Sequence, residues 1–234
     1  MKKIIMSLVM MCITTSCFAQ KSNLKCIYSA TPKVSDQVRQ MQNVYLRDMV
    51  VSKFKKEKKT YTMFVTDKKY LFVKTSDKND GSSMLIGGVN SIYIDRDKDS
   101  IISEKTIVNK SYVIKDIAFS PRWRMTEEKR VINGKKCTKA ISKGIVKAEA
   151  WFTTEIPFGY GPLGYYGLPG LIVELTTPTE VYNLMTFEYL QTAPQMKSPA
   201  KGLVVSDEEF TKKQNEYFAR FGDVKAGDVM VVER

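Results

Sequence analysis

The sequence predicts a mainly β protein with peripheral helices: a single antiparallel meander, curled or partly open, with one helix near each end. Runs rich in β-branched and aromatic residues recur from residue 24 to residue 191 with turn signals between them. The connections are short, and an open sheet of about ten twisted strands rarely stays flat. The 234-residue chain is 43% hydrophobic and 26% charged, which is typical of a folded protein.

The elements follow from periodicity and turn residues. The first strand is predicted at 24–31 and ends at Pro32. Residues 35–56 carry apolar side chains at spacings of three or four, which predicts a helix. Two β-rich runs, 60–65 and 70–75, are separated by four mostly polar residues and predict a hairpin.

A series of further strands fills the middle of the chain. The dipeptide Asn133-Gly134 predicts a type I′ turn between two of them, because both residues tolerate positive φ. These strands are predicted at 91–95, 101–108, 111–118, 123–126, 130–132, 136–142, 147–154, 170–177 and 180–191. Large apolar side chains in these blocks are expected to share one core, namely Trp123, Trp151, Phe152, Ile156, Leu168, Leu171 and Ile172.

The C-terminal part, 192–234, is predicted to pack on the same β domain, which covers 20–191. Residues 192–202 hold two Pro, one Gly and mostly small or polar residues, and predict a loop. Ser206 and Glu209 form a capping-box pattern, so a helix is expected at about 207–220. A short strand is expected at 229–232.

The first 19 residues predict export. Two lysines precede an apolar run of about ten residues, and small residues lead to Ala19, as in a secretory signal peptide. Cleavage after Ala19 is favoured, and lipidation at Cys17 is the alternative. The expected location is therefore the periplasm or the outer membrane.

The charge balance and the missing histidines limit the function. The chain carries a formal net charge of +12 and has no histidine, which removes every His-based triad and metal site. In the envelope, the expected anionic partners are lipids or lipopolysaccharide rather than nucleic acid. A dense lysine cluster is the candidate contact, and a solvated helix end is its alternative interpretation: Lys53, Lys55, Lys56, Lys58 and Lys59.

A glycine-rich aromatic segment from 151 to 175 stands out. Five of the thirteen glycines fall within 159–170. Glycine permits unusual backbone conformations and close approach, and proline removes freedom, so a rigid loop is expected. The loop is interpreted either as a structural crossover or as the rim of a ligand site. The tentative ligand-binding residues are Phe158, Tyr160, Tyr165, Tyr166 and Leu168.

The same segment carries a family resemblance. Residues 167–172 read Gly-Leu-Pro-Gly-Leu-Ile, and the chain resembles the GLPGLI family, secreted envelope proteins of Bacteroidota. The similarity extends over about residues 60–190 through the blocks at 112–116, 123–125, 134–140 and 150–157. It implies an envelope location and a shared fold. The family has no established biochemical activity, so the resemblance supplies no catalytic residues.

Cysteines and acidic residues give weaker candidates. Cys26 and Cys137 remain after the predicted cleavage, and an oxidising compartment makes them a candidate disulfide, with two buried thiols as the alternative. Residues 95–99 imitate the start of a calcium loop but lack its glycine and its final glutamate, so a hairpin turn is expected. No metal, cofactor or catalytic residue is predicted.

Two functional classes remain open. In the first, the protein is a non-enzymatic binding or carrier protein for an apolar, lipid-like or peptide ligand, with the aromatic loop at the mouth of the sheet. In the second, it is a structural or accessory component of an envelope complex that docks through exposed residues. A hydrolase with a histidine-free site is the least favoured class.

Overall fold

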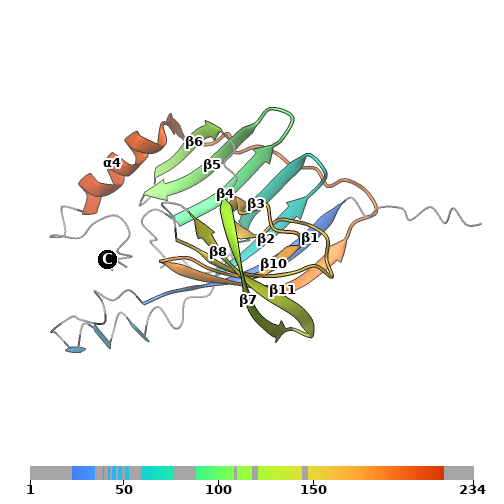
Figure 1. Cartoon of the computed structure of the whole chain (residues 1–234). Helices are drawn as coiled ribbons and strands as arrows, with labels where there is room; N and C mark the ends of the chain where they lie inside the picture. Colours follow the sequence, from blue (N-terminus) through green and yellow to red (C-terminus); the bar gives the residue numbers. More distant parts are fainter. Residues whose placement is uncertain are drawn as a thin grey trace, which may run out of the picture.

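The computed structural model describes residues 23–34, 59–75, 88–107, 110–117, 121–143 and 147–218, with scattered positions between 39 and 52. Twelve strands in these residues join one sheet, in the order β12-β6-β5-β4-β3-β2-β1-β11-β10-β9-β8-β7 (Figure 1). In chain order they are β1 (Leu24–Pro32), β2 (Lys59–Val65), β3 (Lys69–Thr75), β4 (Gly88–Asp95), β5 (Ser100–Ile107), β6 (Lys110–Ile117), β7 (Arg122–Ile132), β8 (Lys135–Lys143), β9 (Glu149–Thr153), β10 (Leu171–Thr176), β11 (Glu180–Tyr189) and β12 (Leu203–Val205).

The sheet consists of two antiparallel meanders joined by the first strand. Strands β2 to β6 form one meander and β7 to β11 form the other. Between them lies β1, which pairs antiparallel with both β2 and β11. The short β12 pairs with β6 in parallel, so the sheet is mixed. The prediction of a mainly β, mostly antiparallel sheet is confirmed, but a single simple meander is wrong.

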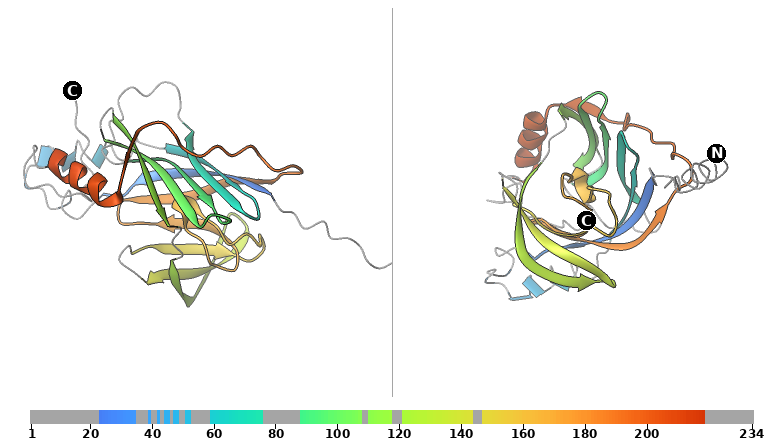
Figure 2. Two further views of the ribbon diagram at one scale, coloured as in Figure 1. Left: turned by 90° about the horizontal axis from the view of Figure 1, so that it is seen from above. Right: turned by 45° about the vertical axis from the view of Figure 1, so that its right-hand side comes forward.

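The sheet is strongly curled, so that one of its faces becomes concave (Figure 2). The two edge strands, β12 and β7, do not pair with each other, and the sheet stays open. Strong twist makes a flat sheet of this width unfavourable, which accounts for the curl.

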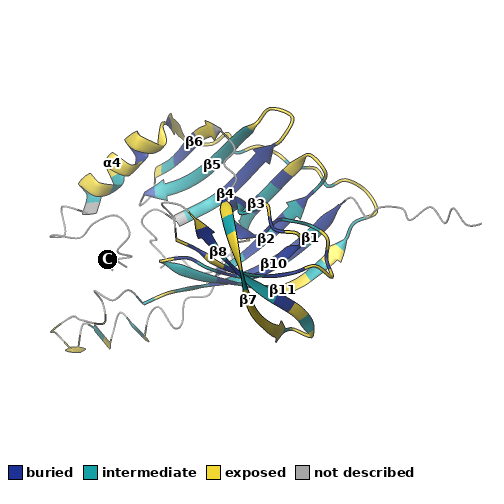
Figure 3. Ribbon diagram, viewed as in Figure 1, coloured by how far each residue is buried: buried dark blue, intermediate teal, exposed yellow. Residues whose placement is uncertain are grey.

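The core lies on the concave side and is rich in aromatic residues. Side chains alternate between faces along a strand, and every second residue of β1 and β2 is buried (Figure 3). The rings of Tyr61 and Phe72 stack with centroids 4.6 Å apart, and Tyr28 and Tyr182 meet Phe72 edge-on. Such pairs stabilise a core beyond the area that they bury.

The predicted core is largely confirmed. Five of its seven residues are buried in one cluster: Phe152, Ile156, Leu168, Leu171 and Ile172. The two tryptophans, Trp123 and Trp151, are half-buried and pack against that cluster. The guanidinium of Arg130 lies 4.1 Å from the ring centroid of Trp151.

The turn signals of the sequence are confirmed. Asn133 (φ 49°) and Gly134 (φ 75°) form the left-handed turn between β7 and β8. Residues 96–99 form the turn between β4 and β5. The two strands predicted at 123–126 and 130–132 are one strand, β7, because a register shift between Met125 and Lys129 lets the pairing continue.

The C-terminal segment confirms the helix and adds a strand. Helix α4 (Asp207–Phe218) begins at the predicted capping box, in which Ser206 and Glu209 exchange two hydrogen bonds of 3.0 Å. Its Phe210 is buried against Tyr112 of β6. The β12 strand was not predicted. The strand expected at 229–232 lies outside the described residues, as does most of the helix expected at 35–56.

The predicted disulfide is not formed. Cys26 and Cys137 are free and buried. They lie on β1 and β8, which have β11, β10 and β9 between them in the sheet. Neighbouring strands are about 4.8 Å apart, so the pairing prediction placed these two strands too close together. In the described part of the chain no helix is long and apolar enough to cross a membrane.

Candidate functional site

The aromatic loop between β9 and β10, residues 154–170, enters the concave side of the sheet (Figure 2). Its short 3-10 helix, η1 (Pro162–Gly164), contacts β3 and β4. The loop therefore occupies space that would be the interior of an open curled sheet.

Buried tyrosine hydroxyls fix the base of the loop. Tyr70 donates a hydrogen bond of 2.8 Å to the carbonyl of Gly161 and accepts one of 2.9 Å from the amide of Gly164. Tyr28 donates to the carbonyl of Ile172, at 2.6 Å. These bonds satisfy backbone groups that would be costly to bury unpaired.

The far side of the loop is held by Trp123 of β7, whose indole N–H donates a hydrogen bond of 2.9 Å to the carbonyl of Tyr166. Within the loop, Tyr160 and Tyr166 form an isolated antiparallel bridge. The loop is thus attached to strands from both meanders, which makes it rigid.

Two glycines show why the sequence of the loop is so restricted. Gly164 has φ +76°, and a Cβ there would lie 3.2 Å from the side chain of Ile94. A Cβ on Gly170 would lie 1.9 Å from the backbone oxygen of Thr153. The first position needs positive φ, and the second needs a close approach of two backbones.

The five residues predicted to bind a ligand are divided by the structure. Tyr160 and Leu168 are buried, with 8% and 5% of their surfaces exposed. Phe158, Tyr165 and Tyr166 are half-buried. Leu168 packs in the core cluster, so it contributes to the fold. Ligand binding by the other four stays a prediction.

The half-buried rings of the loop do not form one surface. Tyr166 lies beside Tyr160, with ring centroids 6.0 Å apart. Tyr165 packs against Trp123 at 5.7 Å, and Phe158 packs against Tyr189 at 6.1 Å. The structure therefore brings Tyr160 and Tyr166 together and places Phe158 beside a different strand.

Sequence reasoning missed a cation at this site. Arg96, in the turn between β4 and β5, places its guanidinium 5.5 Å from the ring centroid of Tyr160 and 5.1 Å from that of Tyr166. The turn was recognised, but only as a poor imitation of a calcium loop. An arginine 64 positions away from Tyr160 gives no local signal of this contact.

Among the described residues, the buried hydroxyl of Tyr160 has no hydrogen-bond partner of ordinary geometry. Burial raises the pKa of Tyr160 most; the Arg96 guanidinium lowers it through its charge and a marginal hydrogen-bonding contact, and the nearby Tyr166 and Asp67 raise it. The group is therefore a neutral donor at physiological pH. Most buried polar groups in proteins are paired, so an unpaired one calls for an explanation.

A buried ion pair lies apart from the loop, where β2 and β11 begin. Lys59 Nζ, at the start of β2, lies 2.6 Å from Glu180 Oε1, at the start of β11. The hydroxyl of Tyr182 donates a hydrogen bond to the other carboxylate oxygen of Glu180. Lys59 is thus buried, while contact of the lysine cluster with an anionic membrane stays a prediction. The other four lysines, Lys53, Lys55, Lys56 and Lys58, lie outside the described residues.

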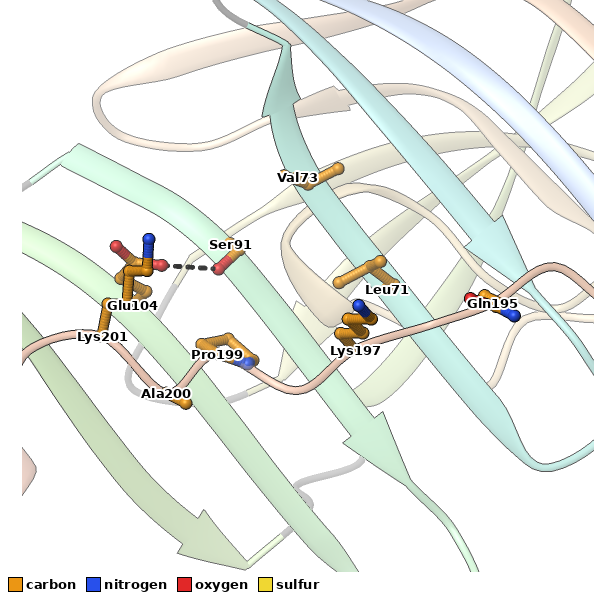
Figure 4. Close-up of a pocket in the computed structure, with 9 residues that line it drawn as sticks. All are labelled: Leu71, Val73, Ser91, Glu104, Gln195, Lys197, Pro199, Ala200 and Lys201. Atoms are coloured by element: carbon orange, nitrogen blue, oxygen red, sulfur yellow. Dashed lines mark hydrogen bonds between the residues drawn. The ribbon is translucent and has the colours of Figure 1, made fainter.

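A shallow groove lies on the outer face, where residues 195–201 cross β3, β4 and β5 (Figure 4). Its volume is about 410 Å³. Ser91 donates a hydrogen bond of 3.3 Å to Glu104 within it, which satisfies the carboxylate. Apolar lining from Leu71 and Val73 is mixed with lysines from the crossing segment. In the described residues no group of three or more acidic or cysteine side chains is placed to hold a metal.

The fold and the loop define a class: mainly β proteins with one large curled sheet and an aromatic loop on its concave side. The model of Porph_ging, a protein family of unknown function, matches residues 103–174. This match runs from β5 to β10, includes the loop, and is consistent with a Bacteroidota-type family. A search of curated proteins finds no match.

Two solved structures of PNGF-II have a similar fold. The structure in space group P21 has a TM-score of 0.52 and 13% identity, and the alignment covers 83% of this chain and 34% of that one. The structure in space group C2 has a TM-score of 0.50 and 12% identity, over 82% and 32% of the two chains. This chain thus spans about a third of the length of PNGF-II. At such low identity the similarity concerns the fold alone.

Proposed function

We propose that this chain is an exported envelope protein of the GLPGLI family that binds an apolar, lipid-like or peptide ligand without catalysis. The observation that carries the proposal is the aromatic loop. Its base is fixed by buried hydrogen bonds, while Tyr165 and Tyr166 remain partly exposed. Aromatic groups that are held rigidly before binding lose little entropy on contact with a ligand.

Export is supported by the signal-peptide pattern of residues 1–19 and by the family resemblance. The match of residues 103–174 to a family of unknown function agrees with this proposal but adds no activity. Burial raises the pKa of the loop residues Tyr160 and Tyr165, so both hydroxyls stay neutral at physiological pH and favour hydrogen bonding over proton transfer.

The proposal is tested by changing Tyr165 and Tyr166 together to Ala. We expect native mass spectrometry of protein purified from its own envelope to show a bound ligand on the wild type and none on the double variant. The neutral fluorescent probe N-phenyl-1-naphthylamine should bind the wild type at least ten-fold more tightly than the double variant.

The matched control is Trp151→Ala. Trp151 is also a half-buried aromatic residue beside an arginine, but it lies on β9 under Arg130, away from the half-buried loop tyrosines. Both variants should lose a similar amount of stability, roughly 1–3 kcal/mol. Removing partly buried aromatic side chains costs less than removing a fully buried aromatic side chain from the core. If the control loses the ligand and the probe equally, the loop is structural and the proposal fails.

A second function, docking in an envelope complex, is favoured by β7. This 11-residue strand is an edge of the sheet, and Met125 and Val131 on it are 60% and 69% exposed. An edge strand can pair with a strand of another protein. A photo-crosslinking residue at position 131 should then capture one defined envelope protein, and Met125→Pro should abolish that product. Crosslinks to many proteins or to none would reject the docking role.

A further inference from the structure

The buried hydroxyl of Tyr160 differs from its neighbours. The four fully buried tyrosines of the core use their hydroxyls: Tyr28 donates to the Ile172 carbonyl, Tyr61 to the Val89 carbonyl, Tyr70 to the Gly161 carbonyl, and Tyr182 to Glu180. Tyr160 stacks on Tyr70 with ring centroids 5.7 Å apart, yet in the described part of the chain its own hydroxyl has no partner of ordinary geometry. The cost of one unpaired buried donor is on the order of 1–3 kcal/mol, so its retention suggests a use.

The cation beside this hydroxyl is Arg96, and the carboxylate of Asp67 also acts on the same hydroxyl. Arg96 forms no ion pair with the described residues, whereas Lys68 in the adjacent turn pairs with Asp97 at 3.2 Å. The guanidinium lies beside the rings of Tyr160 and Tyr166, and the attraction of an exposed arginine to aromatic faces is weak enough for the side chain to move. Five N–H donors of a planar guanidinium match the oxygen atoms of a carboxylate or a phosphate.

We propose that Arg96 and Tyr160 form a binding site for the anionic group of the ligand, a carboxylate or a phosphate. The inference rests on the proposed binding function and specifies its ligand as an anionic amphiphile. The guanidinium pairs with the anion, and the neutral Tyr160 hydroxyl donates a hydrogen bond to it. The apolar part of the ligand then lies along the half-buried ring of Tyr166, whose centroid is 6.0 Å from that of Tyr160.

Access to the hydroxyl requires a movement of Arg96. Arg96 is exposed, and it lies in a tight turn whose backbone is fixed by a hydrogen bond of 2.9 Å from its own amide to the Lys68 carbonyl. Its side chain can therefore leave the ring of Tyr160 and return with an anion, while the turn stays in place. The anion then forms charge-assisted hydrogen bonds with the guanidinium in a place partly shielded from water. Such bonds are stronger there than on an open surface.

The test uses three probes that share a linear dodecyl-length alkyl chain and differ in the head group: dodecanoate, dodecyl phosphate and neutral dodecanol. Each displaces N-phenyl-1-naphthylamine from the full-length exported protein at pH 8 and physiological salt. We expect at least one anionic probe to bind ten-fold or more tightly than dodecanol. A preference for the phosphate points to a phospholipid or lipid A headgroup, and a preference for the carboxylate points to a fatty acid or a peptide C-terminus.

Three variants locate the effect. Arg96→Gln should weaken the binding of the preferred anionic probe about ten-fold or more and leave the affinity for dodecanol unchanged. Tyr160→Phe should weaken the binding of the same anionic probe about three- to ten-fold. Lys98→Gln is the matched control, because it removes the same charge from an exposed position of the same turn and should change neither probe by more than about two-fold.

The outcomes separate this inference from the proposed function. If all three probes bind equally, the anion site is wrong while apolar binding stands. If Lys98→Gln weakens the anion as much as Arg96→Gln, the effect is general electrostatic attraction and the site is wrong. If Tyr160→Phe lowers stability without changing the preference, the hydroxyl serves a bound water only, which also overturns the inference. If no probe binds the wild type, the proposed function itself fails.

Discussion

Two stacked tyrosines, Tyr70 and Tyr160, should respond in opposite ways to the same substitution. Tyr70→Phe removes a hydroxyl that both donates to Gly161 and accepts from Gly164. The two backbone groups that remain are buried and unpaired, and each costs about 1–3 kcal/mol, so the free energy of unfolding should fall by roughly 2–6 kcal/mol. Tyr160→Phe removes a buried hydroxyl that has no partner, so stability should stay equal or rise by about 1 kcal/mol.

Urea unfolding followed by tryptophan fluorescence measures both changes. In a chain of this size about 1 kcal/mol corresponds to roughly 2–4 °C, so Tyr70→Phe should lower the melting temperature by on the order of 10 °C. The two residues share ring type, burial and location, which makes each variant the control of the other. Equal effects of the two substitutions, or a larger loss for Tyr160→Phe, would show that the loop is not fixed through Tyr70.

Three further outcomes follow from local geometry and burial. Gly170→Ala should prevent stable folding or cost more than about 4 kcal/mol, whereas Gly134→Ala, in a turn with open space around it, should cost about 1 kcal/mol by equilibrium unfolding. Cys26 and Cys137 should react with a thiol reagent only after denaturation, giving two free thiols, because burial raises the pKa of each. Burial also raises the pKa of Tyr28, so its contribution to stability is complete below about pH 10 and is lost as pH rises further; a Tyr28→Phe variant should show a shallower alkaline loss of stability.

Local signals in the sequence predicted most of the elements. The turn at Asn133-Gly134 and the capping box at Ser206 depend on residues a few positions apart, and both are present. The pairing of β1 between β2 and β11 was not predictable in this way. It joins residues up to 165 positions apart, Leu24 and Tyr189, and the alternation of buried residues in β1 fits several neighbours equally well.

The candidate site was predicted only in part, because some of its contacts also join residues that are remote in sequence. The composition of the loop at 159–170 identified it as rigid and unusual, and the structure adds where it packs. The contacts that give it a chemical character come from Arg96 and Trp123, on strands and turns remote in sequence. The predicted disulfide was wrong because two cysteines on strands carry no information about how many strands separate them.

The loop and the curl of the sheet depend on each other, and this limits the kind of ligand that fits. A closed sheet of more than about eight strands encloses more space than its own side chains fill. Here Gly164 approaches Ile92 and Ile94 of β4, so the loop covers apolar side chains that an empty concave face would expose. A ligand that entered the centre would have to displace the loop and break the hydrogen bonds of Tyr70. A ligand at the margin of the loop, with one polar group beside Arg96 and Tyr160, requires only the movement of an exposed side chain. The balance of these two costs favours binding at the margin.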